Sequence, residues 1–269
     1  MPETIANARD SDLAYQAIAR DPRYAHFMNI PDRIIRCLDY FGIACNRTEV
    51  RQRLLAYYLF IGVVDDAIDR GELEIGEDIL DRFNDRVPCS ADRTMASRVS
   101  LVTEVLKHNI SDDDYPPVVG KLHELYRAVV AERKVETITA YIEQRKVVGR
   151  LTAELSYVLI RSFLESDGRD LGPFLERVGA VGCLVDSVID FKADARLGLI
   201  SFKPKLSDFR KLLIATLREG LNVTLKHPAL LGVFLEAVRD NLRDRSRAGL
   251  RPAPRFVTAP GKEGVPSVV

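Results

Sequence analysis

The stretch Leu59–Asp69 reads LFIGVVDDAID, and a second stretch, Val181–Asp194, reads VGCLVDSVIDFKAD. Each is an apolar run that leads into aspartates four residues apart. On an α-helix this spacing places side chains on one face, about 6 Å apart along the axis. A carboxylate on an apolar helix face must be paired or must bind a metal, because burial of a lone charge is very unfavourable. The two stretches therefore predict two helices that direct carboxylates toward a shared interior.

The rest of the chain has helical periodicity. Apolar residues recur at intervals of three and four, as in Ile34–Phe41 and Leu212–Leu221, and the alternation typical of strands is absent. Breaks rich in proline, glycine or short polar residues separate the segments: Asp21-Pro22, Ile30-Pro31, Val87-Pro88 with Ser90 as a cap, Ser111–Pro117, Gly168 and His227-Pro228. We expect an all-α fold, a single domain over residues 1–250 in which roughly ten helices surround a central apolar cavity. Residues 251–269, rich in proline and glycine, are expected to form a flexible tail.

Composition excludes several classes of protein. The chain has 46% hydrophobic and 29% charged residues, as soluble globular proteins do. Its 39 basic and 39 acidic side chains cancel, which argues against a nucleic-acid or anionic membrane partner. No apolar run approaches the roughly 18 residues that span a bilayer, and the first residues lack the apolar core of a signal peptide. The cysteines show no CxxC spacing and are interpreted as reduced thiols. We expect a cytoplasmic protein without stable membrane insertion.

Either aspartate stretch alone has a plain alternative explanation as a helix cap or a solvated stripe. Asp112–Asp114, next to Pro116-Pro117, is interpreted in this way as a loop. The apolar context of both stretches favours a site instead. Aspartates without a neighbouring histidine indicate a hard divalent cation, Mg²⁺ above all, rather than zinc or a di-iron centre. The candidate metal ligands are Asp65, Asp66, Asp69, Asp186, Asp190 and Asp194.

Residues near these stretches are candidates for the wall of the cavity. Tyr57, Tyr58 and Ile61 precede Asp65 at helical spacing. A later segment combines Arg145 with a run of small side chains that includes Gly149 and Thr152. A cation above such a wall suits an anionic head group with an apolar tail, although close helix packing explains the small residues equally well. The candidate substrate-binding residues are Tyr57, Tyr58, Ile61, Arg145, Gly149 and Thr152.

These motifs resemble the class I terpenoid synthase superfamily of all-α, Mg²⁺-dependent enzymes. Asp65–Asp69 matches its DDxxD motif. Asp190–Gly198 is similar to the second DxxxD of squalene and phytoene synthases, while Asp186, Asp190 and Asp194 have the spacing of the metal triad of terpene cyclases. The resemblance covers roughly residues 50–205.

The resemblance implies an isoprenoid synthase fold and ionisation of an allylic prenyl diphosphate, with about three Mg²⁺ ions that Mn²⁺ can replace. It implies Asp65, Asp69, Asp190 and Arg145 as catalytic residues and is compatible with a homodimer. Squalene and phytoene synthases carry arginines where this chain has Gly62 and Ile189, which favours a cyclase over a head-to-head prenyltransferase.

Two further alternatives stay open. Nucleotide pyrophosphohydrolases also place acidic helices around Mg²⁺, but their sites are rich in glutamate. A non-catalytic helical interaction module would carry the same aspartates on its surface.

Overall fold

Helix α4 (Arg47–Asp69) carries the first aspartate stretch at its C-terminal end. The Asn46 side chain caps its start, accepting a hydrogen bond from the backbone N–H of Glu49 at 3.3 Å. The helix contacts α3, α6 and α8 along its length, so apolar side chains are buried around most of its circumference. It ends before Gly71, whose φ of 95° is a conformation that favours glycine.

The computed structural model describes residues 2–72, 74–86, 93–165 and 169–247. Apart from one bridge between Cys45 and Leu164, the regular structure in these ranges is helical, which confirms the all-α prediction. The elements are α1 (Pro2–Ala19), η1 (Pro22–Tyr24), α2 (Ala25–Met28), α3 (Ile30–Tyr40), α4, α5 (Ile75–Phe83), α6 (Arg93–His108), α7 (Tyr115–Glu132), α8 (Ile138–Ile160), η2 (Arg161–Phe163), α9 (Leu171–Leu197), α10 (Leu206–Lys226), η3 (Pro228–Leu230) and α11 (Leu231–Arg247).

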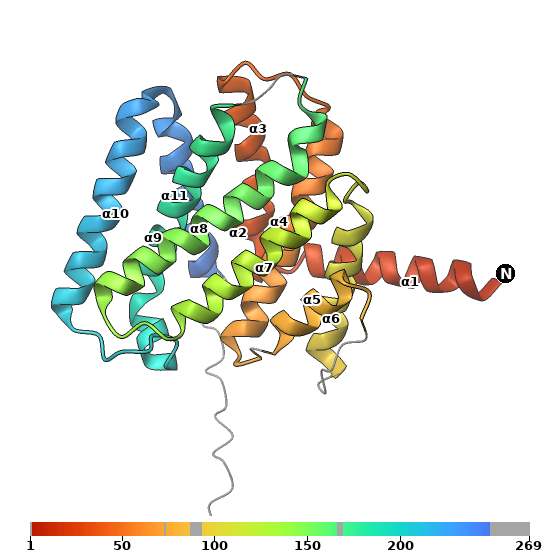
Figure 1. The fold of residues 1–269 in the computed structure, drawn as a ribbon, viewed down its shortest axis with the longest axis horizontal. Helices are drawn as coiled ribbons and strands as arrows, with labels where there is room; N and C mark the ends of the chain where they lie inside the picture. The colour runs from red at the N-terminus through yellow and green to blue at the C-terminus, as the bar shows by residue number, and fades with distance from the viewer. Residues whose placement is uncertain (1, 73, 87–92, 166–168, 248–269) are drawn as a thin grey trace, which may run out of the picture.

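Helices α7 and α8 run side by side across the bundle, and α9 packs against α8 (Figure 1). The α8–α9 pair is the most extensive helix contact of the described residues. Helix α8 is capped by the Thr137 hydroxyl, which accepts a hydrogen bond from the N–H of Ala140 at 3.2 Å. Helix α9 ends at Gly198, whose φ of 70° provides the left-handed C-cap. Both helices that carry aspartate stretches, α4 and α9, pack against α8.

The apolar side chains form a large cluster and a smaller one. The large cluster includes Leu38, Leu54, Leu59 and Leu155, each fully buried. The smaller one lies where α8, α9 and α10 meet, around the fully buried Leu184. Burial of such side chains from several helices drives the assembly of the bundle.

The predicted breaks fall at helix starts where the structure describes them. Pro22, Pro31 and Pro228 lie in the first turns of η1, α3 and η3, where a missing N–H leaves no bond unmade. The predicted cap Ser90, with Val87-Pro88, the break at Gly168 and the tail 251–269 lie outside the described residues.

The loop at Asp112–Asp114 is more than a solvated connection. Asp114 is 3% exposed, and its Oδ2 accepts hydrogen bonds from the hydroxyls of Ser111 and Ser162, each at 2.7 Å. Arg53 and Arg161 lie 3.6 Å from the same carboxylate. Asp114 therefore connects α4, the start of α7 and the end of α8 through a buried charged group.

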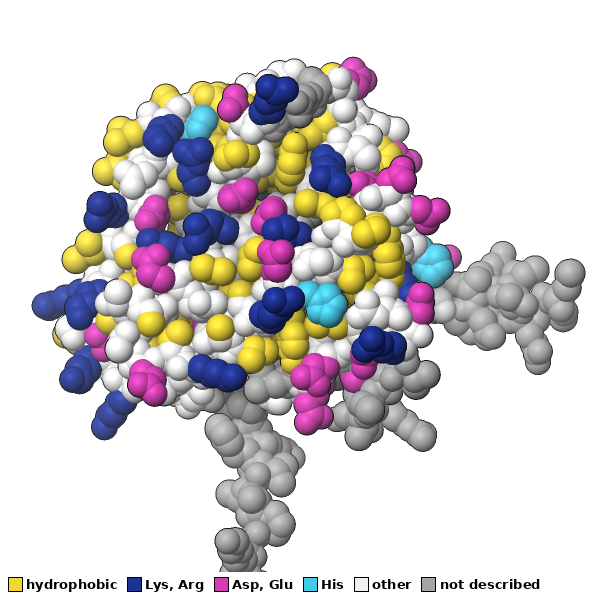
Figure 2. Space-filling view, viewed as in Figure 1, with side chains coloured by type: hydrophobic (Ala, Val, Ile, Leu, Met, Phe, Trp, Pro, Cys, Tyr) yellow, Lys and Arg dark blue, Asp and Glu magenta, His cyan; other side chains and the backbone are white. Residues whose placement is uncertain are grey.

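Over the described part of the chain, no helix combines the length and the apolar character that crossing a membrane requires. Figure 2 shows charged side chains of both signs over the face in view, with apolar side chains between them.

Candidate functional site

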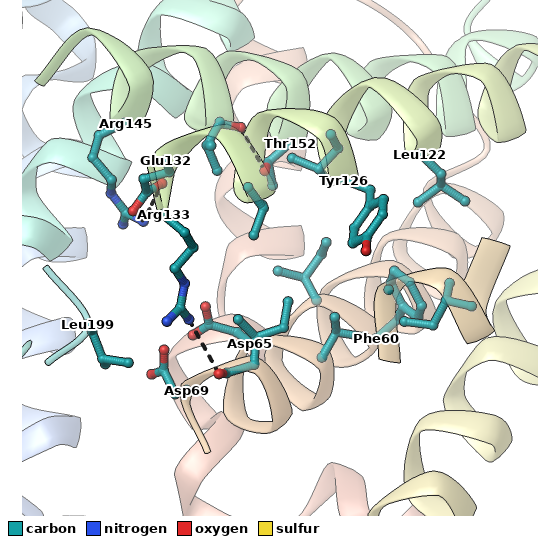
Figure 3. A pocket seen from close by; sticks show the side chains of 18 of the residues that line it. Phe60, Asp65, Asp69, Leu122, Tyr126, Glu132, Arg133, Arg145, Thr152 and Leu199 are labelled. Atoms are coloured by element: carbon teal, nitrogen blue, oxygen red, sulfur yellow. Dashed lines mark hydrogen bonds and ion pairs between the residues drawn. The ribbon is translucent and has the colours of Figure 1, made fainter. Parts of the chain in front are cut away.

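A cavity of about 170 Å³ lies between the C-terminal half of α4 and helices α5, α7, α8 and α9. Apolar side chains form much of its wall, among them Phe60, Ile79, Leu80, Leu122 and Leu125. Charged side chains gather at the opposite end from Leu122 and Phe60 (Figure 3). Those that line the cavity are Asp65, Asp69, Glu132, Arg133, Arg145 and Asp194.

The structure brings the two aspartate stretches to the same cavity. Asp65 and Asp69 line it from the last turns of α4, and Asp194 lines it from the last turn of α9. Asp65 is exposed and Asp69 is half-buried, so the α4 pair lies at the solvent-facing end. Carboxylates separated by 125 residues therefore face one space.

The other three predicted metal ligands are not among the residues that line the cavity. Asp66 accepts hydrogen bonds from Tyr24 Oη at 3.1 Å, Arg23 Nη1 at 3.2 Å and Arg70 Nη2 at 3.1 Å. Its carboxylate thus anchors η1 to α4 instead of lining the cavity, because consecutive helical residues point about 100° apart. Asp186 and Asp190 are half-buried and are not among the residues that line the cavity.

Arg145 lies at the charged end, held by residues from two helices. Its Nε donates to Ser187 Oγ at 2.7 Å, and its Nη atoms lie 3.4 Å from Glu132 and 3.5 Å from Asp186. Burial lowers the pKa of the guanidinium, but Cys183 and these two carboxylates outweigh it and raise the pKa well above the usual value. Arg145 is therefore a fixed positive charge in the wall.

Asp186 has a role that the aspartate spacing alone did not indicate. Its carboxylate is a counter-ion of Arg145, across the α8–α9 contact, and its use as a metal ligand stays a prediction.

Sequence reasoning missed two charged residues of the cavity, Glu132 and Arg133. Glu132 is the last residue of α7 and Arg133 its C-cap. Arg133 Nη2 donates to the backbone carbonyl of Ile68 at 3.3 Å, which links the end of α7 to the end of α4. A helix end carries no periodic signal, so only the packing of α7 against α8 reveals that this pair faces the aspartates (Figure 3).

The predicted wall residues divide into two groups. Ile61 and Thr152 line the cavity, as expected. Tyr57 and Tyr58 do not: they are buried between α4 and α8. The Tyr57 hydroxyl donates to the Thr152 carbonyl at 2.8 Å, and the Tyr58 hydroxyl is hydrogen-bonded to that of Ser156, also at 2.8 Å. Because α8 covers this part of α4, the tyrosine rings fill the interface and do not reach the cavity.

Gly149 also belongs to a helix interface, not to the cavity wall. A Cβ atom at this position would overlap the carbonyl oxygen of Gly179 on α9, and one at Gly179 would overlap that of Gly149. Of the two explanations for the small residues on α8, close helix packing is the one that the structure shows for Gly149.

The donor set at the charged end suits a hard divalent cation, because carboxylate oxygens are the ligands that Mg²⁺ prefers. Among the described residues, however, no three His, Cys, Asp or Glu side chains are grouped closely enough to hold a metal ion by themselves. Mg²⁺ in proteins commonly uses one or two carboxylates and takes its other ligands from water and phosphate oxygens. Asp65 and Asp69 on one side, with Asp194 on the other, fit that kind of shared binding.

A comparison of the chain with protein-family models, with curated proteins and with solved structures finds no match in any of the three. What this cavity does is therefore inferred from its own side chains.

Proposed function

We propose that the protein is a Mg²⁺-dependent terpene synthase that ionises an allylic prenyl diphosphate and releases diphosphate. One observation carries the proposal: carboxylates from α4 and α9 and two arginines gather at one end of a cavity whose remaining wall is largely apolar. An amphiphilic substrate with a polyanionic head and a hydrocarbon tail has this same division of chemistry.

The head group would lie at the charged end. Asp65, Asp69 and Asp194 would hold the cations, and Mg²⁺ there would supply Lewis-acid stabilisation of the negative charge on the leaving diphosphate. Arg145 and Arg133 add positive charge that is already in place before the reaction. When the allylic C–O bond breaks, the electron pair leaves with the diphosphate and an allylic cation remains.

The apolar wall would then control the cation. Side chains such as Phe60, Leu122 and Leu125 exclude water, which would otherwise capture the cation as an alcohol. Loss of a proton, with or without ring closure, gives a terpene. Tyr57 and Tyr58, predicted from the sequence as substrate-binding residues, are buried and do not take part in this scheme.

The cavity volume favours one substrate over two. About 170 Å³ is close to the roughly 150 Å³ of a cavity that holds benzene, and below the roughly 300 Å³ at the lower end of ligand pockets. A prenyl chain must therefore displace wall side chains on entry, and two chains must displace more. This supports the cyclase over head-to-head condensation of two prenyl diphosphates.

The direct test is incubation of the purified protein with geranyl, farnesyl and geranylgeranyl diphosphates and Mg²⁺. Diphosphate release and the hydrocarbon extract are then measured. We expect release from at least one substrate and its loss in excess chelator. Full activity in chelator, or no release from any of the three, refutes the proposal.

Variants of the DDxxD motif separate the site from the scaffold. Asp65→Asn and Asp69→Asn are expected to lower turnover by about 100-fold or more with little change in Tm, because both carboxylates face the cavity. Asp113→Asn, an exposed aspartate outside the site, is the matched control and should retain activity.

A non-catalytic helical module is distinguished by ligand binding. An inert prenyl diphosphate analogue with Mg²⁺ should raise the Tm of the wild-type protein, since a ligand that binds only the native state stabilises it. Asp65→Asn should reduce this shift. An unchanged Tm in the wild type would favour the module.

A further inference from the structure

The outer face of α10 carries an apolar stripe that no described element covers. Ile214, Leu217, Leu221 and Leu225 follow one another at intervals of three and four, so they share one side of the helix. Their exposed fractions are 65%, 64%, 58% and 71%. The opposite side of α10, which includes Leu212, is buried against the bundle. The bundle therefore accounts for only one of the two apolar faces of α10.

Exposed apolar side chains are concentrated in this part of the molecule. Of the ten large hydrophobic side chains exposed among the described residues, eight lie between Leu206 and Leu242, in α10 and α11. Single exposed leucines scattered over a surface need no explanation, but a contiguous group marks an interaction site.

The charges beside the stripe are positive and available. Arg210, Lys211 and Arg218 are exposed, and none forms an ion pair with another described residue of the chain. Figure 2 shows dark-blue and yellow side chains together along the left edge, where Figure 1 places α10.

The two acidic residues of α10 are engaged within the fold. Asp208 accepts a hydrogen bond from the backbone N–H of Lys205 at 2.9 Å, and Glu219 lies 2.7 Å from Lys146 Nζ on α8. The outer face of α10 is therefore locally positive, although basic and acidic residues balance over the whole chain. This local excess is the reason why net charge alone did not reveal the surface.

We propose that the outer face of α10 docks on an anionic lipid surface. A helix that lies in a membrane interface combines an apolar face with flanking basic side chains, and binds through both. The leucine side chains would enter the boundary between head groups and acyl chains, while the arginines and lysines contact lipid phosphates or carboxylates. Such docking is peripheral and needs no membrane-spanning helix.

The positive charge argues against a second copy of the chain as the occupant. In a two-fold symmetric dimer the same patch meets itself, so the basic residues of one α10 would approach those of the other. Like charges in that arrangement weaken association, whereas an anionic surface neutralises them.

The test is cosedimentation of the full chain with vesicles of phosphatidylcholine, alone or with about 30% phosphatidylserine. We expect binding to the anionic vesicles, weak binding to neutral ones, and loss of binding at about 0.5 M salt. The double variant Leu217→Gln/Leu221→Gln is expected to bind at least about tenfold more weakly, since two leucines that would be buried in the membrane are lost. Lys211→Gln/Arg218→Gln should bind the anionic vesicles about fivefold more weakly for each charge removed, at low salt.

The matched control is Leu13→Gln, which changes a leucine on α1 that is 69% exposed and far from α10 in the sequence. It should bind like the wild type. The proposal is overturned if the wild type stays in solution with every vesicle, or if Leu13→Gln and the α10 variants weaken binding equally. It is also overturned if light scattering shows a dimer that Leu217→Gln/Leu221→Gln converts to a monomer, because a second copy then occupies the stripe.

Discussion

Replacing Gly149 with alanine tests how closely α8 and α9 pack beside the charged end of the cavity. The new Cβ would overlap the carbonyl oxygen of Gly179, and would lie 2.7 Å from the carbonyl carbon of Gly179 and 2.8 Å from Cβ of Cys183. Favourable contacts between carbon atoms begin near about 3.5 Å, so the helices must separate locally by a large part of an ångström. Two of the three contacts are with backbone, which cannot rotate away as a side chain can.

The magnitude follows from two opposing terms. Alanine is better than glycine within a helix by about 1 kcal/mol. Overpacking of a close interface lowers the free energy of unfolding by about 1–3 kcal/mol, and by more where backbone is in the way. With backbone in the way, the overpacking cost lies at the upper end, about 3 kcal/mol, so a net loss of about 2 kcal/mol is expected, which for a chain of this size lowers Tm by about 4 °C.

Thermal unfolding followed by circular dichroism measures this change, with Gly182→Ala as the matched control. Gly182 lies on α9 three residues beyond Gly179, and nothing lies within 4 Å of a Cβ placed there. This variant should keep the helix-propensity gain and melt about 1–2 °C above the wild type. If Gly149→Ala melts at or above the wild-type temperature, the α8–α9 contact is not as close as described and the reasoning fails.

Three further predictions concern buried polar groups. Asp114→Asn should lower the free energy of unfolding by about 2–4 kcal/mol in a urea titration, because it leaves two arginines without their buried counter-charge. The free energy of unfolding of the exposed control, Asp113→Asn, should stay within about 0.5 kcal/mol of the wild type, and equal effects of the two variants would contradict the role of Asp114. Stability should fall as pH rises from about 10 to 12, because burial raises the pKa of several tyrosines in the folded chain, so the unfolded chain loses those protons first. The measurement is Tm against pH, with tyrosine ionisation followed at 295 nm, and a Tm that does not change across this window would contradict the prediction. The tyrosines with a pKa raised to about 12 are Tyr24, Tyr58 and Tyr141. Cys45 and Cys183 are both half-buried, but burial raises the pKa of Cys183 to about 12, so at pH 8 iodoacetamide should label Cys45 well before Cys183, as peptide mass spectrometry would show. Labelling in the reverse order would mean that the Cys183 thiol ionises more readily than Cys45.

The DDxxD motif shows how far a local pattern reaches. Its spacing correctly predicted a helix that carries Asp65 and Asp69 on one side, and the structure places both at the cavity. The same pattern could not reveal that Asp66 anchors η1, because Arg23 and Tyr24 come from a segment about 40 residues earlier. Such partners depend on how the chain returns on itself.

The second aspartate stretch, Val181–Asp194, shows the same limit of a local pattern. Asp186, Asp190 and Asp194 are equivalent by spacing, yet the structure gives them different surroundings. Asp186 pairs with Arg145, while Asp194 lines the cavity. An α-helix turns slightly more than one full revolution in four residues, so an eight-residue ladder drifts around the helix and its ends meet different neighbours.

By itself the sequence determined that this protein is built of helices and that two of them carry carboxylates toward an apolar interior. These properties are local, since periodicity and the residues that cap or break helices act within a few turns. Only the tertiary structure decided which aspartates reach the cavity, that Tyr57 and Tyr58 fill a helix interface, and that one side of α10 remains uncovered. The reason is physical: the surroundings of a side chain are set by the helix that packs against it, and that neighbour is distant in the sequence.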